Sequence, residues 1–152
     1  MISRISPCAF AHKTSQEGIL AKTYSADYKR YFIGGEDVGW YLDESGHTNG
    51  TEITYSFSVN DVNLNDTYKR YVYGGAAKWS GIVSINEKKH NNGTGKIHTK
   101  VDYQTQISAM TTKPKTDIDG HLTSWYITIN RAYTITATTI AHEFGHVIGL
   151  VD

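Results

Sequence analysis

The chain has 152 residues, of which 39% are hydrophobic and 20% are charged, so the composition indicates one folded globular domain and excludes an intrinsically disordered chain. Fifteen Lys and Arg residues balance fifteen Asp and Glu residues, and this neutral balance gives no sign of a nucleic-acid partner or of an anionic membrane surface. No apolar run approaches the roughly 18 residues of a membrane-spanning helix, so no transmembrane segment is expected.

The N-terminal residues carry few apolar side chains and no clear period. Residues 1–18 are therefore predicted to be a flexible segment, and residues 19–152 are predicted to form one domain. The start of the chain lacks the apolar stretch of a signal peptide, which leaves open a cytoplasmic protein and one whose signal has been removed. The single cysteine, Cys8, excludes a disulfide within the chain, and it is interpreted as a plain free thiol rather than as a zinc-capping one.

The first half of the domain alternates between strand and helix patterns. Residues 19–24 and 29–33 are candidate strands, and residues 51–59 alternate as a half-buried strand does. Residues 62–80 repeat apolar side chains at helical steps, with Asn63 or Asn65 as a cap and Gly81 as a stop. Gly74 and Gly75 weaken this helix, and they are predicted to allow its close packing on a sheet. The strand at residues 51–59 is expected to place on one face Ile53, Tyr55, Phe57 and Val59.

The second half continues with short extended segments. Strands are predicted at residues 82–87, 96–103 and 124–130, with a further extended segment at 105–111. Residues 113–120 contain Pro114 and are predicted to be a loop. The last helix is expected over residues 134–148, with Thr134 or Thr136 as its cap.

Metal-ligand spacing dominates the last helix. His142 and His146 are four residues apart, so both imidazoles can reach one metal ion, and the carboxylate of Glu143 can reach a water bound to that ion. Gly149 can end the helix in a left-handed turn and bring Asp152 toward the same ion. Two imidazoles and one carboxylate suit a Zn²⁺ ion that keeps an open position for water, and Glu143 would then act as the catalytic base. The alternative is a surface helix whose His and Glu side chains are merely solvated.

The segment from His142 to Asp152 resembles the metzincin signature HExxHxxGxxH, with Asp152 in place of the third histidine as in the snapalysin-type variant. Residues 51–152 more weakly resemble a small bacterial matrixin-like peptidase. The resemblance implies an extracellular, secreted zinc endopeptidase with an α+β fold: a twisted mixed sheet of about five strands, two main helices and a zincin-like N-terminal subdomain. It also implies that a peptide or protein substrate adds to an edge strand above the zinc. The residues expected in that substrate-binding strand are Gln106, Ile107, Ser108, Ala109 and Met110.

Metzincins continue past the third ligand to a methionine-containing turn. Here Met1 and Met110 are the only methionines, and both precede the helix. The resemblance therefore implies a chain that lacks the C-terminal subdomain. The alternative to an endopeptidase is a non-catalytic zincin-like module that binds zinc, a protein partner or both.

A second polar cluster lies at residues 117–121, where Asp117 and Asp119 precede Gly120 and His121. It could bind Ca²⁺ or a second Zn²⁺ together with His90 or His98. A turn at Asp119-Gly120 is the favoured interpretation. His47 is expected at the surface.

Overall fold

The computed structural model describes residues 23–25, 30–33, 36–41, 46–48, 52–117 and 121–150. The expectations for residues 1–18, for Cys8 and for Asp152 therefore lie outside the described residues, as does the turn at Asp119-Gly120.

The strands of the described residues form two separate sheets. The smaller one is antiparallel, in the order β1-β2-β3, with β1 at Thr23–Ser25, β2 at Arg30–Ile33 and β3 at Glu36–Tyr41. The first two strands overlap the predicted segments 19–24 and 29–33, whereas β3 was not predicted.

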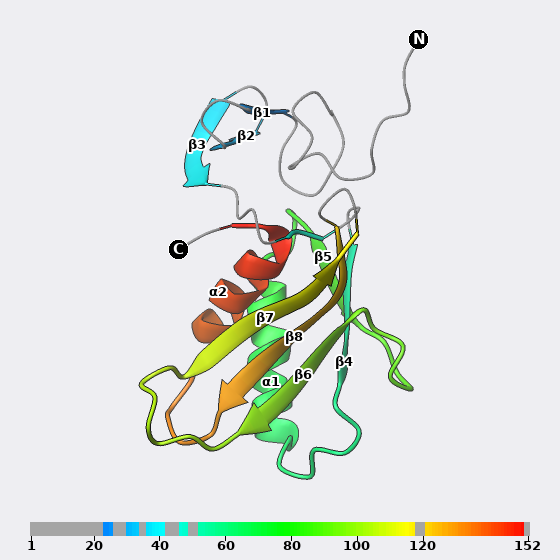
Figure 1. Cartoon of the computed structure of the whole chain (residues 1–152), viewed down its shortest axis with the longest axis vertical. Coiled ribbons are helices and arrows are strands. Elements are labelled where there is room, and N and C mark those ends of the chain that lie inside the picture. The colour runs from blue at the N-terminus through cyan, green and yellow to red at the C-terminus, as the bar shows by residue number, and fades with distance from the viewer. Residues whose placement is uncertain are drawn as a thin grey trace.

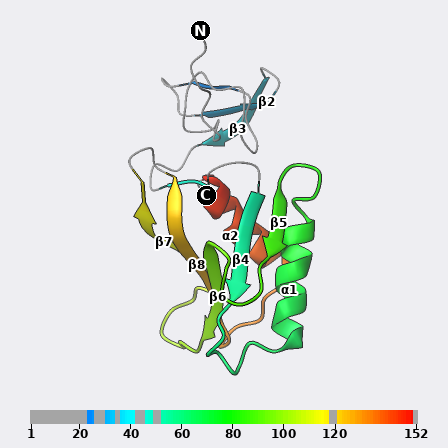
Figure 2. The same ribbon diagram turned by 90° about the vertical axis from the view of Figure 1, so that its right-hand side faces the viewer.

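The larger sheet has five strands in the order β5-β4-β6-β8-β7. Neighbouring strands from β5 to β8 run parallel, and β7 pairs with β8 in the antiparallel direction. Figures 1 and 2 show both helices, α1 and α2, on one face of this sheet. The expected α+β class, with a mixed five-stranded sheet and two helices, is confirmed. The bounds are Glu52–Phe57 (β4), Asp66–Ala77 (α1), Ser84–Glu87 (β5), Gly95–Lys100 (β6), Ala109–Thr116 (β7), Leu122–Asn130 (β8) and Ala137–Ile148 (α2).

The core lies between the helices and the inner face of the large sheet. The strand alternation was predicted correctly for the buried residues of β4 and β8, and the apolar stripe of α2 is fully buried. Val59 is the exception: β4 ends at Phe57, the chain turns away from the sheet, and Val59 is 71% exposed. The residues of β4, β8 and α2 that were predicted to face the core and are buried there are Ile53, Tyr55, Phe57, Trp125, Ile127, Ile129, Ile140, Phe144 and Ile148.

Helix α1 packs against α2 through two glycines. Asn65 caps α1, and its side chain accepts a hydrogen bond from the backbone N–H of Tyr68. A Cβ on Gly75 would lie 2.7 Å from the Cβ of Ile140, and one on Gly74 would lie 2.9 Å from the Cβ of Ala137. The glycines therefore permit the close approach of the two helices. The prediction that they allow packing on a sheet was wrong, because the element that they contact is α2. Neither helix is long and apolar enough to cross a membrane.

Strand β7 extends through much of the segment that was predicted to be a loop. The loop prediction rested on Pro114, which lies inside the strand between two register shifts in the pairing with β8. Proline is tolerated on an edge strand or at a bulge because no ladder hydrogen bond needs its missing N–H. The prediction of a loop from residue 113 was therefore wrong up to Thr116.

Candidate metal centre

Capping and packing fix the start and the rotation of α2. The side chain of Thr136 accepts a hydrogen bond from the backbone N–H of Thr139, and the Thr139 side chain accepts one from the backbone N–H of Thr136. This reciprocal capping box selects Thr136 over Thr134 as the cap. Ile140 and Phe144 are fully buried in the core, so the helix can present its histidines only on the opposite side.

The two histidines meet at their Nε2 atoms. His142 Nε2 lies 3.0 Å from His146 Nε2, and the ring planes are nearly perpendicular, at 87°. Zn–N distances are about 2.0–2.1 Å, so two nitrogens at this separation can both bind one ion with little movement. The ligand atoms of His142, Glu143 and His146 lie within 4.8 Å of one another. This group can therefore hold a metal ion.

The turn after α2 orients His146. Gly149 has a φ of 118°, the left-handed conformation expected at a helix end, and Leu150 N donates to Gly145 O at 3.0 Å. The carbonyl oxygen of Leu150 then lies 2.9 Å from Nδ1 of His146. A carbonyl only accepts hydrogen bonds, so Nδ1 carries the proton and Nε2 keeps its lone pair for a metal.

The carboxylate of Glu143 is held from the edge strand. Glu143 is 6% exposed, and its Oε1 lies 2.7 Å from Oγ1 of Thr111 in β7. The same hydroxyl lies 3.0 Å from the Glu143 carbonyl oxygen, so its single proton is shared between two acceptors on one residue. Thr111 thus links α2, which carries the possible metal ligands, to the strand that was expected to bind substrate.

Three further contacts fix α2 in place. The indole N–H of Trp79, just after α1, donates to the carbonyl of Ala141 at 2.9 Å. The backbone N–H of Thr48 donates to the carbonyl of Val147 at 3.0 Å near the helix end. Gly145 leaves room for the Trp79 ring, which would lie 3.3 Å from an added Cβ.

The residues expected to bind substrate fall into two groups. Ala109 and Met110 lie in β7, the antiparallel edge strand, and Met110 is exposed. Gln106, Ile107 and Ser108 precede the strand. Asn130 explains this: its Nδ2 donates to the carbonyl oxygens of Ile107 at 3.1 Å and Asp102 at 2.8 Å, which holds the preceding segment as a loop.

The second polar cluster does not form a metal-binding group among the described residues, where the only such group is that of α2. His121 Nδ1 instead lies 3.2 Å from Asp117 Oδ2, and its ring packs edge-on against that of His47. His47 is 5% exposed, so its expected surface position was wrong. His98 bonds to Thr128, with 2.7 Å between Nε2 and the hydroxyl, and burial lowers the pKa of His98.

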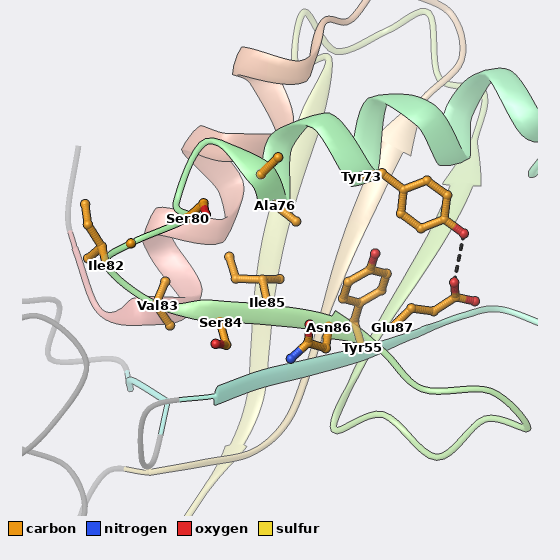
Figure 3. Close-up of a pocket in the computed structure, with 12 residues that line it drawn as sticks. Tyr55, Tyr73, Ala76, Ser80, Ile82, Val83, Ser84, Ile85, Asn86 and Glu87 are labelled. Atoms are coloured by element: carbon orange, nitrogen blue, oxygen red, sulfur yellow. Dashed lines mark hydrogen bonds between the residues drawn. The ribbon is translucent and has the colours of Figure 1, made fainter.

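A large cleft lies away from the metal-binding group. Its volume is about 660 Å³, and it is lined by α1, the connection after it and β5 (Figure 3). Strand β5 is at one edge of the sheet, whereas β7 and Thr111 are at the other. Ligand geometry, not cleft volume, is therefore the basis of the candidate metal centre.

No protein-family model matches the chain, and the search of curated proteins gives no match either. The candidate site is therefore defined by its own residues. Sequence reasoning missed Thr111, the Leu150 carbonyl and Trp79 as supports of the site. The last two carry no sequence signal of this role, and a threonine in a candidate edge strand is too common to have pointed to Glu143.

Proposed function

We propose that this protein is a zinc-dependent endopeptidase. The observation that carries the proposal is the convergence of the His142 and His146 imidazoles beside a buried Glu143 carboxylate, at the edge strand of a mixed sheet. Residues of these types at this spacing, on one helix, are those used by hydrolytic zinc enzymes. The resemblance to metzincins supports the same activity, a zincin-like subdomain and secretion.

In the proposed reaction, His142 and His146 would hold the ion, with Asp152 as the proposed third ligand. Bound zinc supplies a water whose pKa is near neutrality. Glu143 would accept a proton from this water and would later deliver a proton to the leaving amine. Among the described residues β7 pairs only with β8, so an extended peptide can add to its other edge by backbone hydrogen bonds.

Zinc binding is the first test of this proposal. We expect one Zn²⁺ per chain in equilibrium dialysis, and a loss of affinity of at least about 100-fold in His146→Ala, because removal of a ligand should exceed the 10–100-fold effect of removing its supporting partners. His90→Ala is the matched control, since His90 is exposed and lies outside the metal-binding group. Equal zinc affinity in wild type and His146→Ala would refute the assignment of the metal centre.

Thr111 supplies a second, independent check. We expect Thr111→Val to lower kcat by about 10–100-fold, because misplacement of a catalytic group is costly even when the group itself is retained. KM and zinc content should change little, since the backbone of β7 and both histidines remain. Thr111→Ser should restore most of kcat because it restores the hydroxyl.

The neighbouring Thr112→Val is the control for loss of a threonine hydroxyl from β7. Steady-state kinetics with a fluorogenic peptide measure these effects. An unchanged kcat in Thr111→Val would show that the hydrogen bond to Glu143 has no role in turnover.

A further inference from the structure

The cleft beside β5 combines an apolar wall with a group of oxygen atoms. Ala76 of α1 and Ile82, Val83 and Ile85 line its apolar part. Tyr55, Tyr73 and Glu87 line its polar part, and Figure 3 shows the Tyr55 hydroxyl pointing toward α1, on the side where Tyr73 and Glu87 meet. A cleft of about 660 Å³ is within the size range of small-molecule sites.

Tyr55 has a buried side chain whose hydroxyl faces the cleft. It is 1% exposed, and its ring packs against those of Phe57 and Phe144, at centroid distances of 5.5 and 5.7 Å. Its hydroxyl makes no hydrogen bond within the part of the chain that the structure describes, and it is not fully enclosed, because it faces the cleft. A ligand in the cleft would give this hydroxyl a partner.

The neighbours of Tyr55 define the charge that such a ligand should carry. The hydroxyl of Tyr73 donates to Oε1 of Glu87 at 2.8 Å, which leaves the lone pairs of Tyr73 available to accept. Lys89 contacts the other carboxylate oxygen at 3.2 Å, but its side chain is 74% exposed, and such surface pairs contribute little. Burial, followed by the electrostatic effect of Tyr73 and Glu87, raises the pKa of Tyr55, so its phenol is neutral at physiological pH.

We propose that this cleft binds a primary alkylammonium group. An ammonium has three N–H donors, and the polar part of the cleft offers three acceptors: two phenol oxygens and a carboxylate. The aliphatic stem of the ligand would lie along the apolar wall formed by Ala76, Ile82 and Ile85. The ligand is either a free amine or a lysine side chain of another protein, because both present the same chemistry.

The test is a titration of the intact, isotopically labelled protein with n-butylammonium, monitored by NMR at the backbone amides of residues 82–87. We expect saturable shifts, and affinity at least about tenfold weaker for 1-butanol, which has the same chain but no charge. Equal affinity for the amine and the alcohol would overturn the proposal. A parallel titration with N-acetyl-lysine-N-methylamide distinguishes a lysine side chain from a free amine as the ligand. Binding at least as tight as that of n-butylammonium identifies a lysine side chain. Weaker binding identifies a free amine.

Two substitutions test the residues involved. Glu87→Gln should weaken n-butylammonium binding about tenfold, because it removes the charge-assisted hydrogen bond. Tyr55→Phe should weaken it about threefold without loss of folding, since the removed hydroxyl has no partner among the described residues. Glu52→Gln is the matched control: Glu52 is an exposed carboxylate that bonds to Asn86 and does not line the cleft. Unchanged affinity in Glu87→Gln, or an equal loss in Glu52→Gln, would contradict the assignment.

Discussion

Replacement of Glu143 by glutamine is expected to lower the rate of casein hydrolysis by about 10²–10⁴-fold while zinc remains bound. Glutamine keeps the size of the side chain, and its carbonyl oxygen can still accept the hydrogen bond of Thr111. It cannot accept a proton from a metal-bound water. Since His142 and His146 are unchanged, the zinc affinity should stay within a few-fold of the wild-type value.

The measurement compares wild type and Glu143→Gln, each with and without added zinc and each with its metal content determined. Glu52→Gln is a suitable control because it replaces an exposed carboxylate that lies outside both the metal-binding group and the cleft. Zinc-dependent cleavage in the wild type and the control, but not in Glu143→Gln, would support an endopeptidase. Stoichiometric zinc without any cleavage by the wild type would favour a non-catalytic zinc-binding module instead.

Local sequence patterns were sufficient to predict both helices and most strands of the larger sheet. The alternation in Ile53, Tyr55 and Phe57 and the helical step from Ile140 to Phe144 each encode a buried face within a few residues. The failed loop prediction at residues 113–116 has another cause, which is that the deciding partner is distant in the chain. Pro114 is accommodated because β7 is an edge strand, and that depends on the order of the whole sheet.

The metal-binding group could be predicted because its three members lie on one helix, where geometry follows from spacing alone. The supports of this group could not, since the hydroxyl of Thr111 comes from 32 residues away and the indole of Trp79 from 62 residues away. Asp152 remains a prediction from the sequence. The sequence thus predicts which groups could act on a bound metal, whereas the fold determines how those groups are held.

The contact between α1 and α2, beneath the candidate metal centre, should be sensitive to side-chain atoms added at the glycines of α1. A Cβ on Gly75 would lie 2.7 Å from the Cβ of Ile140 and 2.9 Å from the backbone nitrogen of Ala141. Neither atom is the mobile end of a side chain, so Gly75→Val must push α2 away from α1. We expect a loss of about 3 kcal/mol in the free energy of unfolding, at the upper end of the cost of overpacking.

Urea unfolding of Gly75→Val and of Ala77→Val measures this cost. Ala77 is exposed in the same helix, so its substitution reports only the lower helix propensity of valine, about 0.5 kcal/mol. Equal losses in the two variants would show that the helices can separate freely.

Gly75→Val should also affect the two histidines differently from the contact between Glu143 and Thr111. His142 and His146 belong to α2 and move together when that helix shifts, so zinc affinity should change little in the folded fraction of Gly75→Val. The contact between Glu143 and Thr111 joins α2 to β7, and a shift of the helix should lengthen it. We therefore expect kcat to fall more than zinc affinity. Equal losses of both would mean that the helix contact supports the metal ligands directly.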